Sequence, residues 1–202
     1  MFRRKNYINY VSFIFVICSG CVQQNNAIRE IPITTYYNNC DAIIDFGVII
    51  TIGDPSDKFM ISLPYSWDIQ ESYFDTLFGI FASNIFETGN DPKKLQSISI
   101  TGYSTNDSLK VYVEKELTSL KKDTSISVNE MGKTTINDRN GYWVLFENNF
   151  KDGDIVNLVV FIKREKSNEI YLIQSSVYKT ENFRERICRL KQLVNTFEIV
   201  EN

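Results

Sequence analysis

The residues best suited to chemistry stand near the start of the chain, where two residues separate Cys18 from Cys21. A pair at this spacing can exchange thiol for disulfide, or can supply part of a zinc site. A redox pair needs a folded βα context around it, and a zinc site needs further ligands. The pair is followed by the polar run QQNN, and the chain of 202 residues contains no histidine. Both interpretations are therefore disfavoured.

The residues before this pair have the organisation of an export signal. Arg3, Arg4 and Lys5 form a positive start, and residues 8–17 are mostly apolar. Roughly ten residues of helix span about 15 Å, which is too short to cross a hydrocarbon core of about 30 Å. A basic start, a short apolar run and small residues are typical of a secretory signal peptide.

The end of this segment resembles the lipobox of bacterial lipoproteins, in which Leu, Ala or Ser, and Gly or Ala precede a lipidated cysteine. Ser19, Gly20 and Cys21 match that pattern, whereas Cys18 replaces the usual leucine. The resemblance implies cleavage between Gly20 and Cys21, transfer of diacylglycerol to the Cys21 sulfur, and acylation of the new amino terminus, for example with palmitate. Two or three acyl chains anchor a protein stably. The alternative is an N-terminal anchor that is not cleaved.

The rest of the chain has the size of one folded domain. We expect a signal peptide over 1–20, a lipidated N-terminus and tether over 21–40, and one α+β domain over 41–202. Loss of the leader removes three basic residues, so the formal net charge falls from −3 to −6. An acidic chain without basic runs disfavours a nucleic-acid partner. The expected location is the bacterial cell envelope, where the lipid on Cys21 would hold the protein to a membrane.

Two further cysteines, Cys40 and Cys188, could form a disulfide. An exported chain meets an oxidising compartment in many bacteria. The bridge would close a loop of roughly 150 residues and would stabilise the fold by a few kcal/mol in the chain-entropy model. The alternative is that both residues are small buried hydrophobes. The sequence leaves both alternatives open.

The spacing of apolar residues predicts antiparallel strands and two amphipathic helices. Two β-rich runs, 45–53 and 58–64, are joined by the turn DPSD and predict a hairpin. Segment 68–90 fits a helix and a strand equally. Helices are expected over 106–122, capped by Asp107 or Ser108, and over 181–197, capped by Thr180. Further strands are expected over 95–104, 125–128, 133–138, 142–149, 155–164 and 169–178, with a short one at the end of the chain. This order predicts an α+β fold, an α/β/α sandwich with a central antiparallel sheet covered by the two helices.

Several motifs in this order resemble the PsbP-like superfamily, which includes photosystem extrinsic subunits, Ran-binding Mog-type proteins and bacterial DcrB-type lipoproteins. They are F-x-I-x-L-P-x-x-W over 59–67, the segment 108–117, GKTTINDRNGYW over 132–143, and the final NTFEIV. The resemblance covers residues 48–200 and implies the same sandwich. It implies structural roles for its matching residues: Pro64 ends a strand, Trp67 packs in the core and Gly141 makes a turn. It also implies a binding or assembly factor.

The sequence offers little for catalysis. Without histidine, the Ser-His-Asp and Cys-His arrangements and the usual zinc and haem ligands are absent. No phosphate-binding or dinucleotide-binding glycine motif occurs. Asp54 and Asp57 flank one turn, and Asp152 and Asp154 flank another. We interpret them as solvated hairpin tips, with weak calcium binding as the alternative. We therefore expect no enzyme activity and no cofactor or metal.

An aromatic cluster is the remaining candidate for function. Most of its rings should lie in the core. Any that stay exposed would form a patch for a partner, which we place in segment 68–90. We predict a lipid-anchored, non-enzymatic binding or assembly module for an envelope protein. The alternatives are a periplasmic carrier of a small apolar ligand, with a cavity under the same segment, and a hydrolase that uses carboxylates alone. The cluster comprises Tyr65, Trp67, Tyr73, Phe74, Phe78 and Phe81.

Overall fold

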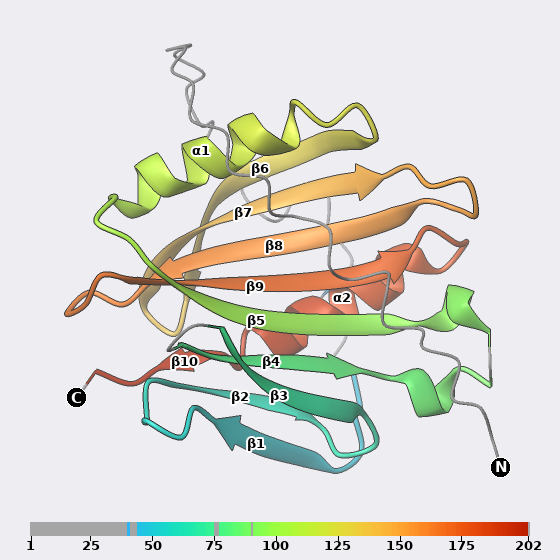
Figure 1. The fold of residues 1–202 in the computed structure, drawn as a ribbon. Coiled ribbons are helices and arrows are strands. Elements are labelled where there is room, and N and C mark those ends of the chain that lie inside the picture. Colours follow the sequence, from blue (N-terminus) through green and yellow to red (C-terminus); the bar gives the residue numbers. More distant parts are fainter. Residues whose placement is uncertain (1–39, 41–43, 75–76, 90, 202) are drawn as a thin grey trace, which may run out of the picture.

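The computed structural model describes residue 40 and residues 44–74, 77–89 and 91–201. These residues form two antiparallel sheets and two α-helices (Figure 1). The smaller sheet has the order β1-β2-β10, with β1 Ile49–Gly53, β2 Phe59–Pro64 and β10 Glu198–Ile199. The larger sheet has the order β3-β4-β5-β9-β8-β7-β6. Its strands are β3 Asp68–Phe74, β4 Leu77–Ser83, β5 Gln96–Ser104, β6 Ile126–Ile136, β7 Arg139–Asn148, β8 Ile155–Lys163 and β9 Glu169–Tyr178.

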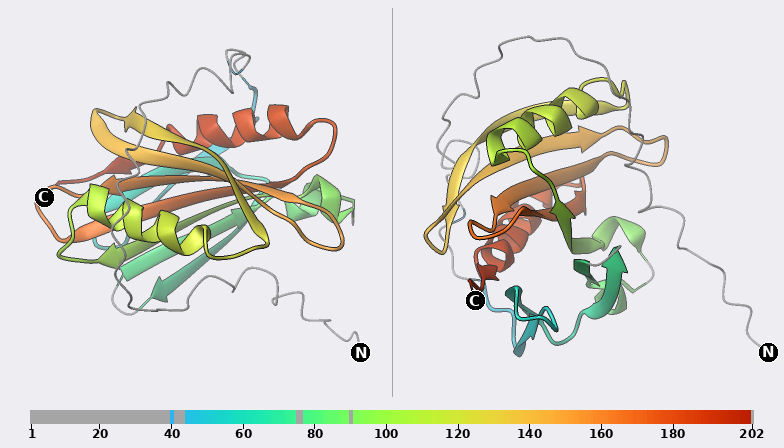
Figure 2. Two further views of the ribbon diagram at one scale, coloured as in Figure 1. Left: turned by 90° about the horizontal axis from the view of Figure 1, so that it is seen from above. Right: turned by 60° about the vertical axis from the view of Figure 1, so that its left-hand side comes forward.

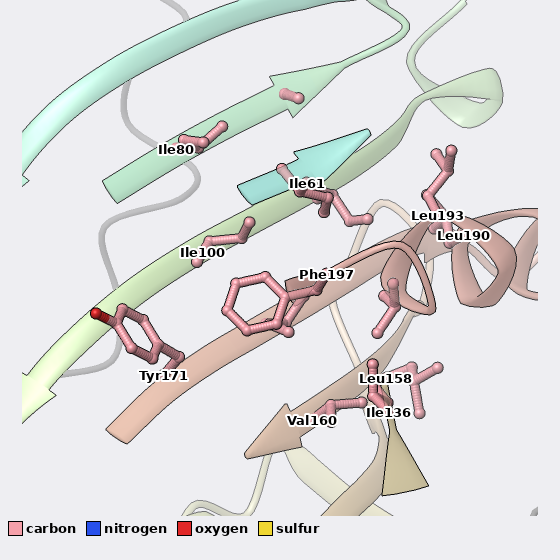
Figure 3. Close-up of a cluster of buried hydrophobic side chains, with 14 of the residues drawn as sticks. Ile61, Ile80, Ile100, Ile136, Leu158, Val160, Tyr171, Leu190, Leu193 and Phe197 are labelled. Carbon is pink, nitrogen blue, oxygen red and sulfur yellow. The ribbon is translucent and has the colours of Figure 1, made fainter. Parts of the chain in front are cut away.

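The helices α1 (Leu109–Leu120) and α2 (Phe183–Val194) lie on opposite faces of the larger sheet (Figure 2). On one face Trp143 and Leu145 of β7 pack in the core that includes α2 and the smaller sheet. Figure 3 shows part of this core, with Ile61 of β2, Leu158 of β8 and Leu190 of α2. On the other face Val144 and Phe146 of β7 pack with α1. Because both faces are covered here, residues 143–146 of β7 and 158–162 of β8 are continuously apolar. The predicted α+β sandwich with a central antiparallel sheet is confirmed.

The ambiguous segment 68–90 forms a hairpin, β3–β4, followed by the 3₁₀ helix η2 (Ile85–Glu87). A second 3₁₀ helix, η3 (Pro92–Lys94), precedes β5. Strand β4 pairs with β3 on one side and with β5 on the other. The backbone hydrogen bonds of these two ladders outweigh the helical spacing of the apolar residues.

Three local expectations were wrong. The strands expected at 125–128 and 133–138 form one strand, β6, whose register shifts between Val128 and Glu130. The turn before β7 uses Asn137 and Asp138, with φ of 45° and 63°, so Gly141 lies inside the strand. Thr180 does not cap α2, whose N-cap residue is Asn182.

One predicted cap is confirmed. Ser108 is the N-cap of α1, and its hydroxyl accepts a hydrogen bond from the amide of Val111 at 3.3 Å. Within the described part of the chain, no helix is both long and apolar enough to cross a membrane.

The described chain begins against α2. A disulfide joins Cys40 to Cys188 of α2, with their Cα atoms 5.2 Å apart. The amide of Ile44 donates to Oε1 of Gln192 at 3.1 Å. The guanidinium of Arg189 lies 5.3 Å from the ring centre of Phe46. Residues before β1 are therefore attached to α2 at three points. Gly20 and Cys21 lie outside the described residues.

Candidate functional site

Five exposed apolar side chains gather at one end of the molecule. They come from three places: the entry to β1, the turn after β2, and η2. Pairing of Ile49 with Pro64, and of Asp68 with Ser83, brings these strand ends to the same side. We name this surface the apolar end. Its residues and exposed fractions are Val48 70%, Ile49 40%, Tyr65 69%, Ile85 49% and Phe86 76%.

Hydrogen bonds hold the three segments of the apolar end together. The amide of Tyr65 donates to the carbonyl of Val48 at 2.8 Å. The hydroxyl of Ser66 donates to Oε1 of Glu87 at 2.5 Å. The turn after β2 is therefore tied both to the entry of β1 and to η2, and the three segments that carry the exposed apolar side chains lie together.

The burial of residues around η2 is the reverse of the usual pattern. The polar residues on either side of it, Asn84 and Thr88, are both only 5% exposed. Asn84 Oδ1 accepts from the amide of Gln96 at 2.7 Å, and the Thr88 hydroxyl donates to the carbonyl of Ile85 at 2.9 Å. Ile85 and Phe86 point outward instead. Exposed large apolar groups on a fixed backbone are typical of a protein-interaction surface.

The aromatic cluster noted in the sequence is divided by the fold. Trp67 and Phe78 are buried, at 4% and 2% exposure, as expected of core residues. Tyr65 belongs to the apolar end. Tyr73 is exposed at the opposite end of β3, where its ring centre lies 5.5 Å from that of Phe78. Phe81 is partly buried, and the side chain of Phe74 lies outside the described residues.

Four members of the apolar end were not singled out by the sequence analysis. Val48 and Ile49 were included in a strand run, and Ile85 and Phe86 were assigned to the ambiguous segment. The available signal was the pair Ile85-Phe86 enclosed by the polar residues Asn84 and Glu87 just before a turn. The placement of the patch in segment 68–90 was correct for Ile85 and Phe86.

The interior under segment 68–90 is filled by its own side chains, since Leu77, Phe78, Ile80 and Ala82 are all at most 6% exposed. A cavity of about 20 Å³ lies elsewhere, between β6, β7, β8 and α2. Trp143 lines it, and among the described residues its buried Nε1 has no hydrogen-bond partner. A space of this size suits one water molecule, and an apolar ligand needs far more.

A wider hollow of about 300 Å³ is open to solvent on the β6–β7 hairpin. Lys133, Thr134 and Asn140 contribute to its lining, together with Gly141 and Tyr142. This hollow is open to solvent and three of its five lining residues are polar or charged, so it does not match the enclosed apolar cavity expected of a ligand carrier.

A cluster of charged residues surrounds Glu169 at the start of β9. Glu169 of β9 binds Lys58 at 2.7 Å and Arg164 at 3.3 Å, and the Tyr171 hydroxyl donates to it at 3.3 Å. Burial raises the pKa of Glu169, but hydrogen bonds and charge from Lys58 and Arg164 outweigh burial and leave that pKa below its ordinary value. Burial and the nearby Glu169 charge raise the pKa of Tyr171. The cluster joins the smaller sheet to the larger one.

The acidic turns also have structural partners. Asp54 is 4% exposed, and its carboxylate accepts from the amide of Ser56 at 2.6 Å. Asp57 has φ 54°, and its amide donates to the carbonyl of Asp54 at 2.8 Å. The carbonyl of Asp154 accepts from the amide of Lys179 at 2.8 Å. Across the described ranges, no group of three or more His, Cys, Asp or Glu is placed to hold a metal ion.

Sequence comparison identifies no relative, since no family model and no curated protein matches the chain. Solved structures do match. The PsbP protein (CyanoP) of Synechocystis sp. PCC 6803 has TM-score 0.56 at 9% identity, over 79% of this chain and 98% of that one. The Ran-binding protein Mog1p of Saccharomyces cerevisiae has TM-score 0.53 at 15% identity, over 76% and 96%.

A third similar structure is LpqN of Mycobacterium tuberculosis, which is described as involved in cell envelope biogenesis. It has TM-score 0.53 at 11% identity, over 85% of this chain and 99% of that one. Identities this low establish a shared fold and no shared activity. The chain therefore has the PsbP/Mog1-like α+β fold.

Proposed function

We propose that this protein is a lipid-anchored, non-enzymatic binding or assembly module of the bacterial cell envelope, which contacts a protein partner through its apolar end. The observation that carries the proposal is the apolar end itself. Its five side chains are held outward by a hydrogen-bonded backbone and by buried polar residues beneath η2.

The chemistry of this surface favours a protein as the partner. Phe86 and Tyr65 are large, stiff side chains that lose little entropy on binding, and aromatic residues often supply much of the energy of an interface. The Tyr65 hydroxyl adds one hydrogen bond. The expected partner surface is apolar and includes a polar atom that can reach this hydroxyl.

Two further observations support the envelope as the location. The lipobox resemblance at Ser19, Gly20 and Cys21 provides an anchor. The similar LpqN is described as involved in cell envelope biogenesis. The similar Mog1p, described as a Ran-binding protein, supports a protein partner and not the location. The motifs shared with DcrB-type lipoproteins support the same assignment.

The binding surface is tested by crosslinking in the native envelope, followed by isolation of the full-length protein and mass spectrometry. The variant Phe86→Ser is compared with Phe150→Ser. Phe150 is 50% exposed in the β7–β8 connection and does not belong to the apolar end. We expect the native chain and Phe150→Ser to recover the same partner, and Phe86→Ser to recover about tenfold less, which corresponds to about 1.4 kcal/mol. Equal recovery by all three chains would contradict the proposed surface.

The anchor is tested separately with Cys21→Ser. This change should abolish palmitate labelling and release the protein from membranes, because the acylated sulfur and the cleavage signal are both lost. Unchanged labelling would contradict the lipobox assignment of Cys21, and an unlabelled protein that stays with the membrane would indicate an N-terminal anchor that is not cleaved.

A further inference from the structure

The outer strands of the two sheets differ in their protection against pairing with another chain. Unpaired backbone groups at a sheet edge are a template for strand addition, and proteins block them with charges, bulges or short strands. At the edges of the larger sheet, β3 carries Asp68 and Glu71, and β6 carries Glu130 and Lys133 with a register shift. In the smaller sheet, β10 is only two residues long. Each of these three edges has a recognised form of protection.

Strand β1 has none of these features. Its five residues, IITIG, include no charge and no proline, and they pair with β2 in an uninterrupted register. Ile49, Thr51 and Gly53 are exposed. In Figure 1, β1 lies at the lower rim of the ribbon, with no described element beyond it. The edge is therefore open within the part of the chain that the structure describes.

Two hydrogen bonds establish which backbone groups of β1 face this open edge. The carbonyl of Val48 accepts from Tyr65, and the amide of Asp54 donates to Phe59. In an antiparallel pair, hydrogen-bonded and non-hydrogen-bonded positions alternate. The even-numbered residues Ile50 and Ile52 therefore bond to β2. The N–H and C=O groups of Ile49, Thr51 and Gly53 point away from it.

We propose that a second copy of this chain pairs with β1 in antiparallel orientation, about a twofold axis at Thr51. Thr51 then faces Thr51 of the second copy, and Ile49 faces Gly53 of the second copy at either end. Each of these three pairs exchanges two backbone hydrogen bonds, about six in total. No other antiparallel register uses all three outward-facing residues of both copies.

The side chains in this register favour a second copy. Branched Ile49 lies opposite glycine, which leaves room for it, and no charged residue lies opposite a like charge within β1. The two smaller sheets become one sheet of order β10-β2-β1-β1-β2-β10.

An interface of five residues per copy is below the standard size of about 1,600 Å². The pairing should therefore depend on concentration, and confinement to one membrane would favour it. The inference extends the proposed function but does not depend on it.

The first test is a crosslink in the full-length protein in its native envelope. In Thr51→Cys the paired Cα atoms would lie about 5.5 Å apart, within the range of about 4.4–6.8 Å for a disulfide. The control is Ser62→Cys, because Ser62 is the cross-strand neighbour of Thr51 on β2, with their hydroxyl oxygens 3.0 Å apart. Ser62 lies one strand further from the twofold axis than Thr51 in each copy. The distance between the two copies of residue 62 is therefore larger than that between the two copies of residue 51 by two strand spacings of about 4.8 Å each, and it comes to about 15 Å in total.

We expect an oxidant-dependent dimer for Thr51→Cys and none for Ser62→Cys or the native chain. Dimers of both cysteine variants, or of neither, would overturn the proposal. A crosslink from Thr51→Cys to a different protein would also overturn it, because the edge would then accept a strand from that protein.

The second test separates pairing from folding. Thr51→Pro removes the N–H that faces the edge and leaves the bonds to β2 in place, whereas Thr51→Ala removes the same hydroxyl and keeps the N–H. In sedimentation of the solubilised full-length chain, the native protein and Thr51→Ala should self-associate as concentration rises. Thr51→Pro should stay monomeric with an unchanged circular dichroism spectrum. The proposal fails if Thr51→Pro associates as strongly as Thr51→Ala, or if the native chain stays monomeric throughout.

Discussion

At the residue scale, Glu169 connects three charged or polar groups from different parts of the fold. Its side chain is 12% exposed and bonds to Lys58, Arg164 and Tyr171. The resulting pKa lies below the ordinary value for glutamate. A carboxylate of this kind stabilises the folded state fully above its unfolded pKa, about 4.3, and loses that contribution as pH falls through the folded pKa.

Glu169→Gln should therefore lower the free energy of unfolding by about 1–2 kcal/mol at pH 7, because charged hydrogen bonds are lost. The difference from the native protein should begin to shrink as pH falls below the unfolded pKa of about 4.3, because the unfolded chain binds the proton first, and it should be lost once pH has fallen through the lowered folded pKa. Urea unfolding at several pH values measures both effects. The exposed Glu181→Gln is the control. A difference that stays constant from pH 7 to 3 would show that ionisation of Glu169 does not stabilise the fold.

At the element scale, β7 shows why a glycine was mistaken for a turn residue. Gly141 follows the sequence DRN, which is typical of a turn, yet it pairs with Thr134 and Ile162 inside the larger sheet. A Cβ atom on Gly141 would lie 2.8 Å from the carbonyl oxygen of Phe161. Because that oxygen belongs to the backbone of β8, the clash can be relieved only by moving a strand.

Gly141→Ala should therefore destabilise the protein by about 1–3 kcal/mol. Gly53→Ala is the matched control, since its Cβ would meet the nearest oxygen, that of Phe59, at 3.5 Å, which is ordinary contact. We expect this control to change stability by no more than about 0.5 kcal/mol. Thermal unfolding of both variants measures the difference. Equal midpoints for the two variants would mean that β8 moves away from Gly141 at little cost.

At the scale of the whole molecule, the Cys40–Cys188 disulfide connects the start of the described chain to α2 across a sequence separation of 148 residues. Closing so long a loop restricts the unfolded chain strongly in the chain-entropy model. Reduction should lower the free energy of unfolding of the native protein by about 2–5 kcal/mol. The measurement is denaturant unfolding with and without reductant. The control is Cys40→Ser, which lacks the bridge and should have the same free energy of unfolding in both conditions. A native protein with the same stability in both conditions would contradict a closed bridge.

The candidate site could be predicted only in part, and particular residues show why. The aromatic content predicted core positions for most rings of the cluster, which is correct for Trp67 and Phe78. The capping pattern offered Asp107 or Ser108 as the helix start, and Ser108 is the N-cap, because a cap depends on neighbours close in the chain. The apolar end combines residues near 48, 65 and 86. Their exposure depends on strand pairing and on polar contacts such as Asn84 with Gln96, which have no periodic signal.

The sequence by itself determined most of the local elements, the α+β class and an N-terminal lipobox pattern that stays a prediction. The physical reason is that alternation and helical spacing report which side chains share one face of one element. Only the tertiary structure decided what covers each face. It left Phe86 exposed, joined Cys40 to Cys188 and, among the residues that the structure describes, placed no strand on the outer edge of β1. These outcomes depend on contacts between segments far apart in the chain, and no pattern within a single segment encodes them.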